Sequence, residues 1–192
     1  CSSDLDFSLY FFGDYKDYES NSPYKLIMEA AKYADKQKFK AIWLPERHFN
    51  SFGGFSPNPA VISSALARET HDICLRASIV MPLQHPARIV EEWSVVQHLS
   101  QSKQVGLALA PGWHTNDFIL NPDAWETRKE LLYKNILITQ QLWSGKQYTF
   151  LGPNNIPTPT ETFPKPGHCN LPLWIASIDN REVFAKAGEL GI

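Results

Sequence analysis

Hydrophobic and polar positions alternate along the chain in blocks that predict a repeated strand–helix order. The predicted strands are short apolar runs, each about the length of a buried strand. They span residues 5–12, 40–44, 73–82, 105–110 and 171–176. Between them lie segments with apolar residues at helical spacing, at residues 23–38, 60–69, 86–99, 125–143 and from 182 onward. Because strands that alternate with helices pair in parallel, the pattern predicts a parallel sheet with helical crossovers.

Two architectures share this order, the doubly wound sheet and the (β/α)₈ barrel. The dinucleotide signal G-x-G-x-x-G is absent after the first predicted strand, which ends in Phe11-Phe12-Gly13-Asp14. We therefore predict an α/β fold of the (β/α)₈ TIM-barrel type. A complete barrel has eight strands and roughly 250 residues. Residues 1–192 are thus expected to form one barrel domain, truncated to about the first five βα units, with an excursion at 148–170. Its open sheet edge would need cover.

The most informative polar cluster follows the second predicted strand. Glu46, Arg47 and His48 come directly after an apolar run, and Gly53-Gly54 and a proline-rich helix start lie beyond them. In barrels and open α/β sheets, catalytic groups lie at the carboxyl ends of strands. The alternative interpretation is an ion pair that closes the strand end, and the residues alone favour neither.

Composition limits the classes of binding partner to expect, but it does not identify a substrate. The formal net charge is −2 and 43% of the residues are hydrophobic, which gives no electrostatic argument for binding nucleic acid or an anionic membrane. No stretch has the length of a membrane span, and the N-terminal segment lacks the basic region of a signal peptide. Three widely spaced cysteines fit neither a disulfide framework nor a zinc site, so we predict no metal and a cytoplasmic location.

Several ordered motifs resemble the bacterial luciferase-like flavin monooxygenases, above all the subgroup found beside polyketide and nonribosomal peptide assembly lines. The likeness extends from about Phe7 to the last residue. The matching blocks are WLPERHF at 43–49, FGG at 52–54, PNPA at 57–60, VMPLQHP at 80–86, EEW at 91–93, GWH at 112–114, NDF at 116–118 and AGELG at 187–191.

The resemblance implies a barrel that binds reduced FMN at the C-terminal ends of its strands and uses O₂, with a separate reductase supplying FMNH₂. It implies that His48 is a proton donor or orienting group, held by Glu46 or Arg47. The best-studied luciferases have two histidines after the glutamate, and this chain has Arg47 in the first of those places. That departure argues against light emission with an aldehyde and is compatible with hydroxylation.

The resemblance also implies a set of flavin contacts. A non-proline cis peptide in the third strand would support the flavin ring, and the matching bond is Ala77–Ser78. Trp113 would line the flavin pocket, although a core position is the alternative. Phosphate donors would be Arg128, Ser177 and Arg181, the last two in the turn before the final helix. An exposed helix charge is the plainer interpretation of Arg128.

Two further candidates received plainer interpretations from the sequence. His85, at the start of the helix at 86–99, is most simply a loop or N-terminal contact, with a catalytic role as the weaker alternative. The pair at 116–117 is most simply a cap for the next segment.

Three functions stay open at the level of the sequence. The leading hypothesis is an FMNH₂-dependent monooxygenase that hydroxylates an organic substrate, free or bound to a carrier protein, and it is compatible with a homodimer. The second is a non-catalytic fragment or an accessory flavin-binding subunit. The third is a deazaflavin-dependent oxidoreductase, which would not need O₂.

Overall fold

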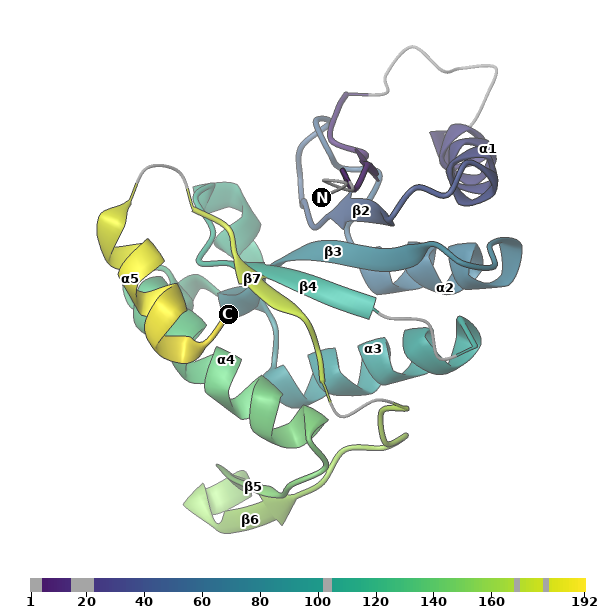
Figure 1. Ribbon diagram of the computed structural model, residues 1–192. Coiled ribbons are helices and arrows are strands. Elements are labelled where there is room, and N and C mark those ends of the chain that lie inside the picture. The colour runs from purple at the N-terminus through teal and green to yellow at the C-terminus, as the bar shows by residue number, and fades with distance from the viewer. Residues whose placement is uncertain (1–4, 15–22, 102–104, 168–169, 178–179) are drawn as a thin grey trace.

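The computed structural model describes residues 5–14, 23–101, 105–167, 170–177 and 180–192, and it contains the predicted alternation of strands and helices (Figure 1). The strands of the main sheet are β1 (Ser8–Tyr10), β2 (Ala41–Pro45), β3 (Cys74–Val80), β4 (Val105–Ala110) and β7 (Leu173–Ile175). The α-helices are α1 (Pro23–Lys36), α2 (Pro59–Glu69), α3 (Pro86–Leu99), α4 (Arg128–Trp143) and α5 (Arg181–Leu190).

The five main strands lie in the sheet in the same order as in the chain, β1-β2-β3-β4-β7. Every neighbouring pair is parallel, with Leu44 opposite Ala77 and Ala77 opposite Leu107. A doubly wound sheet would reverse its strand order at a switch point. This sheet has no reversal, which confirms the predicted parallel sheet of the barrel type. Its two edges are β1 and β7.

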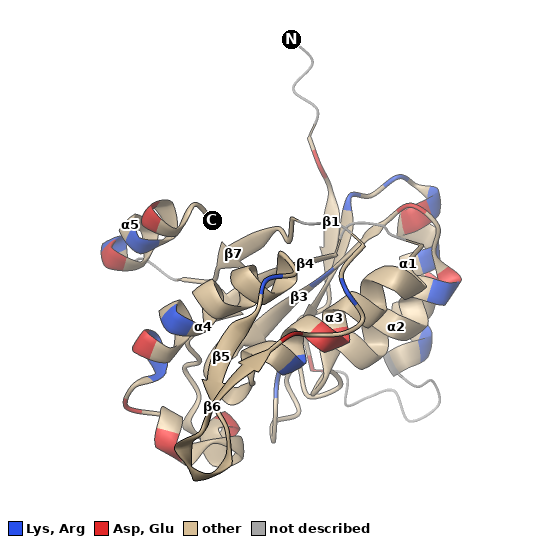
Figure 2. Ribbon diagram, turned by 90° about the horizontal axis from the view of Figure 1, so that it is seen from below, with Lys and Arg blue, Asp and Glu red and all other residues tan. Residues whose placement is uncertain are grey.

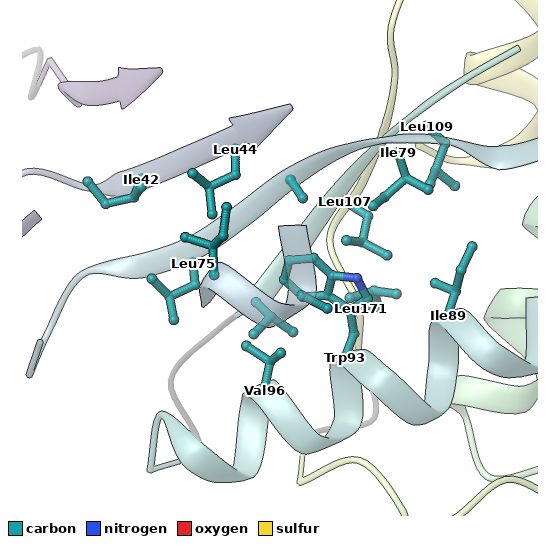
Figure 3. Packing of buried hydrophobic residues seen from close by; sticks show 14 of the residues in the cluster. Ile42, Leu44, Leu75, Ile79, Ile89, Trp93, Val96, Leu107, Leu109 and Leu171 are labelled. Carbon is teal, nitrogen blue, oxygen red and sulfur yellow. The ribbon is translucent and has the colours of Figure 1, made fainter. Parts of the chain in front are cut away.

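The hydrophobic core lies between one face of the sheet and the helices. Successive residues of a strand point to opposite faces, and Leu75, Ala77 and Ile79 of β3 all belong to the core cluster. The indole of Trp93 in α3 is 1% exposed and lies beneath the strands, between Ile89 and Val96 on its own helix (Figure 3). Aliphatic residues spaced along each strand therefore determine which face the helices cover.

The opposite face of the sheet carries a cation between two aromatic rings. The guanidinium carbon of Arg76 is 5.3 Å from the ring centroid of Trp43 and 4.8 Å from that of Trp174. The two indoles contact each other edge to face, with their centroids 5.1 Å apart. Within the described residues, Arg76 has no carboxylate partner, and its buried Nε has no hydrogen-bond acceptor. Arg76 is partly exposed, and among the described residues the charge of its guanidinium is contacted by the two indole rings.

The predicted excursion contains an antiparallel hairpin of β5 (Tyr148–Leu151) and β6 (Pro157–Thr160). A 3₁₀ turn, Pro153–Asn155, joins the two strands. The hairpin returns along α4 and lies away from the main sheet (Figure 1).

Charged residues lie mainly on the exposed surfaces of the helices and the loops, and few follow the strands (Figure 2). One such pair joins α1 to α2, where Lys32 Nζ is 2.7 Å from Glu69 Oε2. This hydrogen bond raises the pKa of Lys32 and lowers that of Glu69. In the part of the chain that the structure describes, no helix is both long enough and apolar enough to cross a membrane.

Candidate active site

The loop after β2 is fixed at both of its ends. The peptide N–H of Glu46 donates to Ser78 O at 2.8 Å, which extends the pairing with β3 by one residue. Further on, Gly53 N donates to Gly13 O at 2.8 Å, which ties the loop to the segment after β1. The side chain of Asn58 then caps α2 by accepting from Ala60 N at 3.0 Å. The polar residues of this loop are therefore held at the carboxyl ends of the strands.

Glu46 is the centre of a buried hydrogen-bond network. Its side chain is wholly buried, and its Oε2 accepts from Val80 N at 2.6 Å. Its Oε1 accepts from Gln84 Nε2 at 2.5 Å and lies 3.1 Å from His48 Nε2. The imidazole of His48 is 11% exposed, so it lies at the boundary between this network and solvent. The structure thus brings Glu46 and His48 together and leaves the imidazole accessible.

Arg47 points away from that network and pairs with Asp117. Its Nη1 is 3.3 Å from Asp117 Oδ2, and the two side chains are 5% and 2% exposed. Trp113 lies against the same guanidinium, with 5.0 Å between the guanidinium carbon and the ring centroid. Arg47 Nε and Asp117 Oδ1 are both buried, and neither has a hydrogen-bond partner among the described residues. His48 is therefore held by Glu46 and not by Arg47.

Asp117 is the residue of this group that the sequence interpretation missed. The sequence predicts a cap for the next segment, but among the described residues its Oδ1 has no hydrogen-bond partner and its Oδ2 is buried against Arg47. Seventy positions separate it from Arg47 in the sequence. The signal in the sequence was the motif Asn116-Asp117-Phe118, which follows a strand. Phe118 is buried, and the adjacent carboxylate of Asp117 is buried with it.

The cis peptide expected at Ala77–Ser78 is not present, and that prediction was wrong. The only cis bond among the described residues is Phe163–Pro164. Ala77 and Ser78 are paired in register with β2 on one side and β4 on the other, and regular pairing of this kind uses trans peptides. Ala77 is fully buried toward the helices, whereas Ser78 faces the other way, with its Oγ 3.2 Å from Tyr10 Oη.

The remaining predicted flavin contacts lie past the ends of other strands. Trp113 follows β4 and is 71% exposed. Arg128 begins α4, where its Nη1 donates to Trp125 O at 2.6 Å and its guanidinium carbon is 4.0 Å from the Trp125 ring centroid. Ser177 is half-buried after β7, and Arg181 is exposed at the first position of α5. No described contact joins these last three residues to Glu46 or His48.

The turn before α5 is already capped by a side chain. Asn180 Oδ1 accepts from Glu182 N at 3.1 Å and from Val183 N at 3.4 Å. These are two of the N–H groups that a helix start offers to a phosphate. Residues 178 and 179, which belong to the predicted phosphate turn, lie outside the described residues. Of the predicted phosphate donors in this turn, the structure describes Ser177 and Arg181.

A cavity of about 470 Å³ lies outside the Glu46 network, between the start of α3, α4 and the hairpin. His85 lies on its wall, with its ring centroid 4.7 Å from that of Phe150. This position corresponds to the loop contact that the sequence favoured for His85. Gln84 belongs both to the cavity wall and to the Glu46 network.

Gly53 allows the backbone to pass close to Arg47. A Cβ at this position would be 2.7 Å from Arg47 Cγ, and φ is +76°. We expect Gly53→Ala to lower the free energy of unfolding by about 1–2 kcal/mol, because a left-handed backbone disfavours a side chain. Urea unfolding measures the change. The control is Gly188→Ala in α5, where a Cβ would meet nothing within 4 Å. A Gly53→Ala protein as stable as the wild type would contradict the close approach.

Comparison with known proteins now identifies the family. The sequence profile described as "Luciferase-like monooxygenase" matches residues 6–192. The chain belongs to the luciferase-like monooxygenase family. Over 95 residues it is 28% identical to the alkanal monooxygenase alpha chain of Photorhabdus luminescens. These 95 residues are 49% of this chain and 26% of that relative. The curated relative is therefore considerably longer than this chain.

Solved structures show the luciferase-like fold at low sequence identity. The monooxygenase RslO1 from Streptomyces bottropensis matches with a TM-score of 0.83 and 17% identity, over 97% of this chain and 58% of that one. The FMN complex of the oxygenating constituent of 3,6-diketocamphane monooxygenase from Pseudomonas putida matches with a TM-score of 0.78 and 15% identity. The match covers 98% of this chain and 56% of that one. An F420-dependent secondary alcohol dehydrogenase matches with a TM-score of 0.67 and 18% identity. The match covers 90% of this chain and 51% of that one. The chain thus spans between one half and three fifths of these structures.

Proposed function

We propose that this chain supplies the flavin-binding strand ends of an FMNH₂-dependent monooxygenase that uses O₂ to hydroxylate an organic substrate. The observation that carries the proposal is the pairing of His48 with the buried carboxylate of Glu46 at the carboxyl end of β2. Membership of the luciferase-like monooxygenase family supports it. A substrate bound to a carrier protein is the more specific form, and it rests on the motif likeness alone.

The residues at the strand ends have the chemistry that a reduced flavin nucleotide needs. The indole of Trp113 is exposed and can stack on a flat ring. Arg128 uses one of its five N–H groups on a carbonyl, and Arg181 is exposed, so both have donors left for a phosphate. Ser177 adds a hydroxyl. When bound, the reduced flavin supplies the electrons that activate O₂.

His48 is assigned the proton transfer. An ionised carboxylate only accepts hydrogen bonds, so Glu46 holds the Nε2–H form of the ring and leaves Nδ1 as the basic nitrogen. Histidine is the side chain whose ordinary pKa is nearest to neutral pH, which suits a general acid or base. In the proposed reaction, Nδ1 takes up or returns a proton, while Glu46 keeps the ring in place.

We expect the purified chain to bind FMNH₂ more tightly than FMN in an anaerobic titration followed by flavin absorbance or fluorescence. Arg128→Ala should weaken binding of FMNH₂ by about 10- to 100-fold, since a hydrogen bond to a charged group contributes about 1.5–3 kcal/mol. Lys129→Ala, an exposed neighbour on the same helix, is the matched control. A folded chain that binds neither form of the flavin would contradict the proposed site.

The proposed reaction needs partners that the chain itself does not contain. A separate reductase would deliver FMNH₂, and two copies of the protein would form a homodimer. Product formation that depends on NADH, O₂ and an added flavin reductase supports the monooxygenase. Flavin binding without any product from a screen of substrates would favour the non-catalytic alternative, an accessory flavin-binding subunit.

The structural likeness to an F420-dependent alcohol dehydrogenase favours a second candidate, hydride transfer with a deazaflavin. Such an enzyme would bind the deazaflavin in place of FMN and would work without O₂. Parallel titrations of the chain with FMN and with F420 separate the two. Tighter binding of F420 would replace the monooxygenase proposal.

A further inference from the structure

We propose that Gln84 is a positioning residue of this site, which sets how firmly Glu46 holds His48. Its amide and the imidazole compete for the same carboxylate oxygen. The inference deepens the proposed function, because it concerns the histidine to which that function assigns proton transfer. Gln84 is not assigned a contact with flavin or substrate, and it acts only through Glu46.

The competition follows from the hydrogen bonds around Glu46. Oε2 is occupied by the peptide N–H of Val80 at 2.6 Å, which fixes that half of the carboxylate to the end of β3. Oε1 then receives both Gln84 Nε2, at 2.5 Å, and His48 Nε2, at 3.1 Å. Because one oxygen shares its charge between two donors, a stronger bond to the amide leaves a weaker bond to the imidazole.

Burial makes this sharing matter. The side chain of Glu46 is wholly buried, and no lysine or arginine among the described residues forms an ion pair with it. The adjacent Arg47 is paired with Asp117 instead. Among the described residues, the carboxylate of Glu46 is therefore stabilised by its N–H donors, and in a buried site each of those hydrogen bonds depends strongly on the others.

Gln84 also occupies a place from which it can be altered without breaking a strand or a helix. It lies between the 3₁₀ turn Met81–Leu83 and the first residue of α3, Pro86. In addition to its contact with Glu46, Gln84 lines the cavity, as does the adjacent His85. A methionine has nearly the same length and lacks the donor, so Gln84→Met removes the competing hydrogen bond and keeps the volume.

The test is the signal of the His48 Hε2 proton in the full 192-residue chain with histidine labelled by ¹⁵N, assigned with a His48→Gln spectrum. In Gln84→Met we expect this proton to shift downfield and to exchange with water about tenfold more slowly, because Oε1 becomes available to the imidazole alone. The matched control is Asn135→Leu, since Asn135 is another amide that lines the same cavity and has no contact with Glu46.

An unchanged Hε2 signal in folded Gln84→Met would overturn the proposal, and so would a signal that weakens or disappears. If the methionine variant does not fold, Gln84→Asn provides the same comparison, because it keeps an amide that is one methylene too short to reach Glu46. The measurement uses neither flavin nor O₂. A chain that fails to bind flavin but shows the expected shift would contradict the proposed function and leave the role of Gln84 standing.

Discussion

Asp117→Ala is expected to lower the free energy of unfolding by about 3–5 kcal/mol, because it leaves a buried charge without its partner. Arg47 is 5% exposed, and Asp117 is its only carboxylate among the described residues. Equilibrium unfolding in urea, followed by tryptophan fluorescence, measures the difference from the wild type.

Two further variants show whether the loss comes from the unpaired charge. Asp123→Ala removes an exposed carboxylate from the same segment and should change stability by less than about 0.5 kcal/mol. The double variant Arg47→Met/Asp117→Leu removes both charges and should recover most of the stability, since apolar residues can replace a buried pair. If the double variant is no more stable than Asp117→Ala, packing rather than charge explains the loss.

His48→Gln is expected to lower the turnover number by about 10²- to 10⁴-fold, the usual contribution of a positioned acid or base. Glutamine can still donate a hydrogen bond to Glu46 but cannot exchange a proton near neutral pH. The affinity for FMNH₂ should stay within about twofold of the wild type, because binding and proton transfer are assigned to different residues. The measurement is steady-state product formation with a flavin reductase, together with the anaerobic flavin titration.

The matched control is His71→Gln, because His71 has an 87% exposed side chain and lies before β3, outside the strand-end cluster. It should keep wild-type turnover. Wild-type turnover in His48→Gln would remove the catalytic role of His48. A variant that loses flavin binding together with turnover would instead indicate that His48 is a flavin contact.

Apolar pattern predicted the interior elements well and the sheet edges poorly. The helix expected at residues 86–99 and the strand expected at 105–110 have the predicted bounds as α3 and β4. The strand expected at 5–12 contains only Ser8–Tyr10, and the one at 171–176 contains only Leu173–Ile175. Both are edge strands with one neighbour each. The apolar runs at these edges continue beyond the last residue that is paired with the neighbouring strand, so the sequence cannot show how far an edge strand is paired.

Residues close in sequence were easier to assemble into a site than residues far apart. Glu46 and His48 are two positions apart, and their hydrogen bond was among the predicted arrangements. Gln84 entered the sequence argument only as part of a motif, and Asp117 was interpreted as a cap, because their partners lie 38 and 70 positions away. Such pairings follow from the register of β2, β3 and β4, which hydrophobic periodicity does not specify.

The position of Arg76 limits which surface can pack on the face of the sheet opposite the helices. Its guanidinium is flanked by Trp43 and Trp174 and has no carboxylate partner within the described residues. An apolar surface laid over it would take the charge out of water without compensation, which costs several kcal/mol. A surface that brings an acidic side chain to this point is therefore favoured over a wholly apolar one, and Arg76 discriminates between the two.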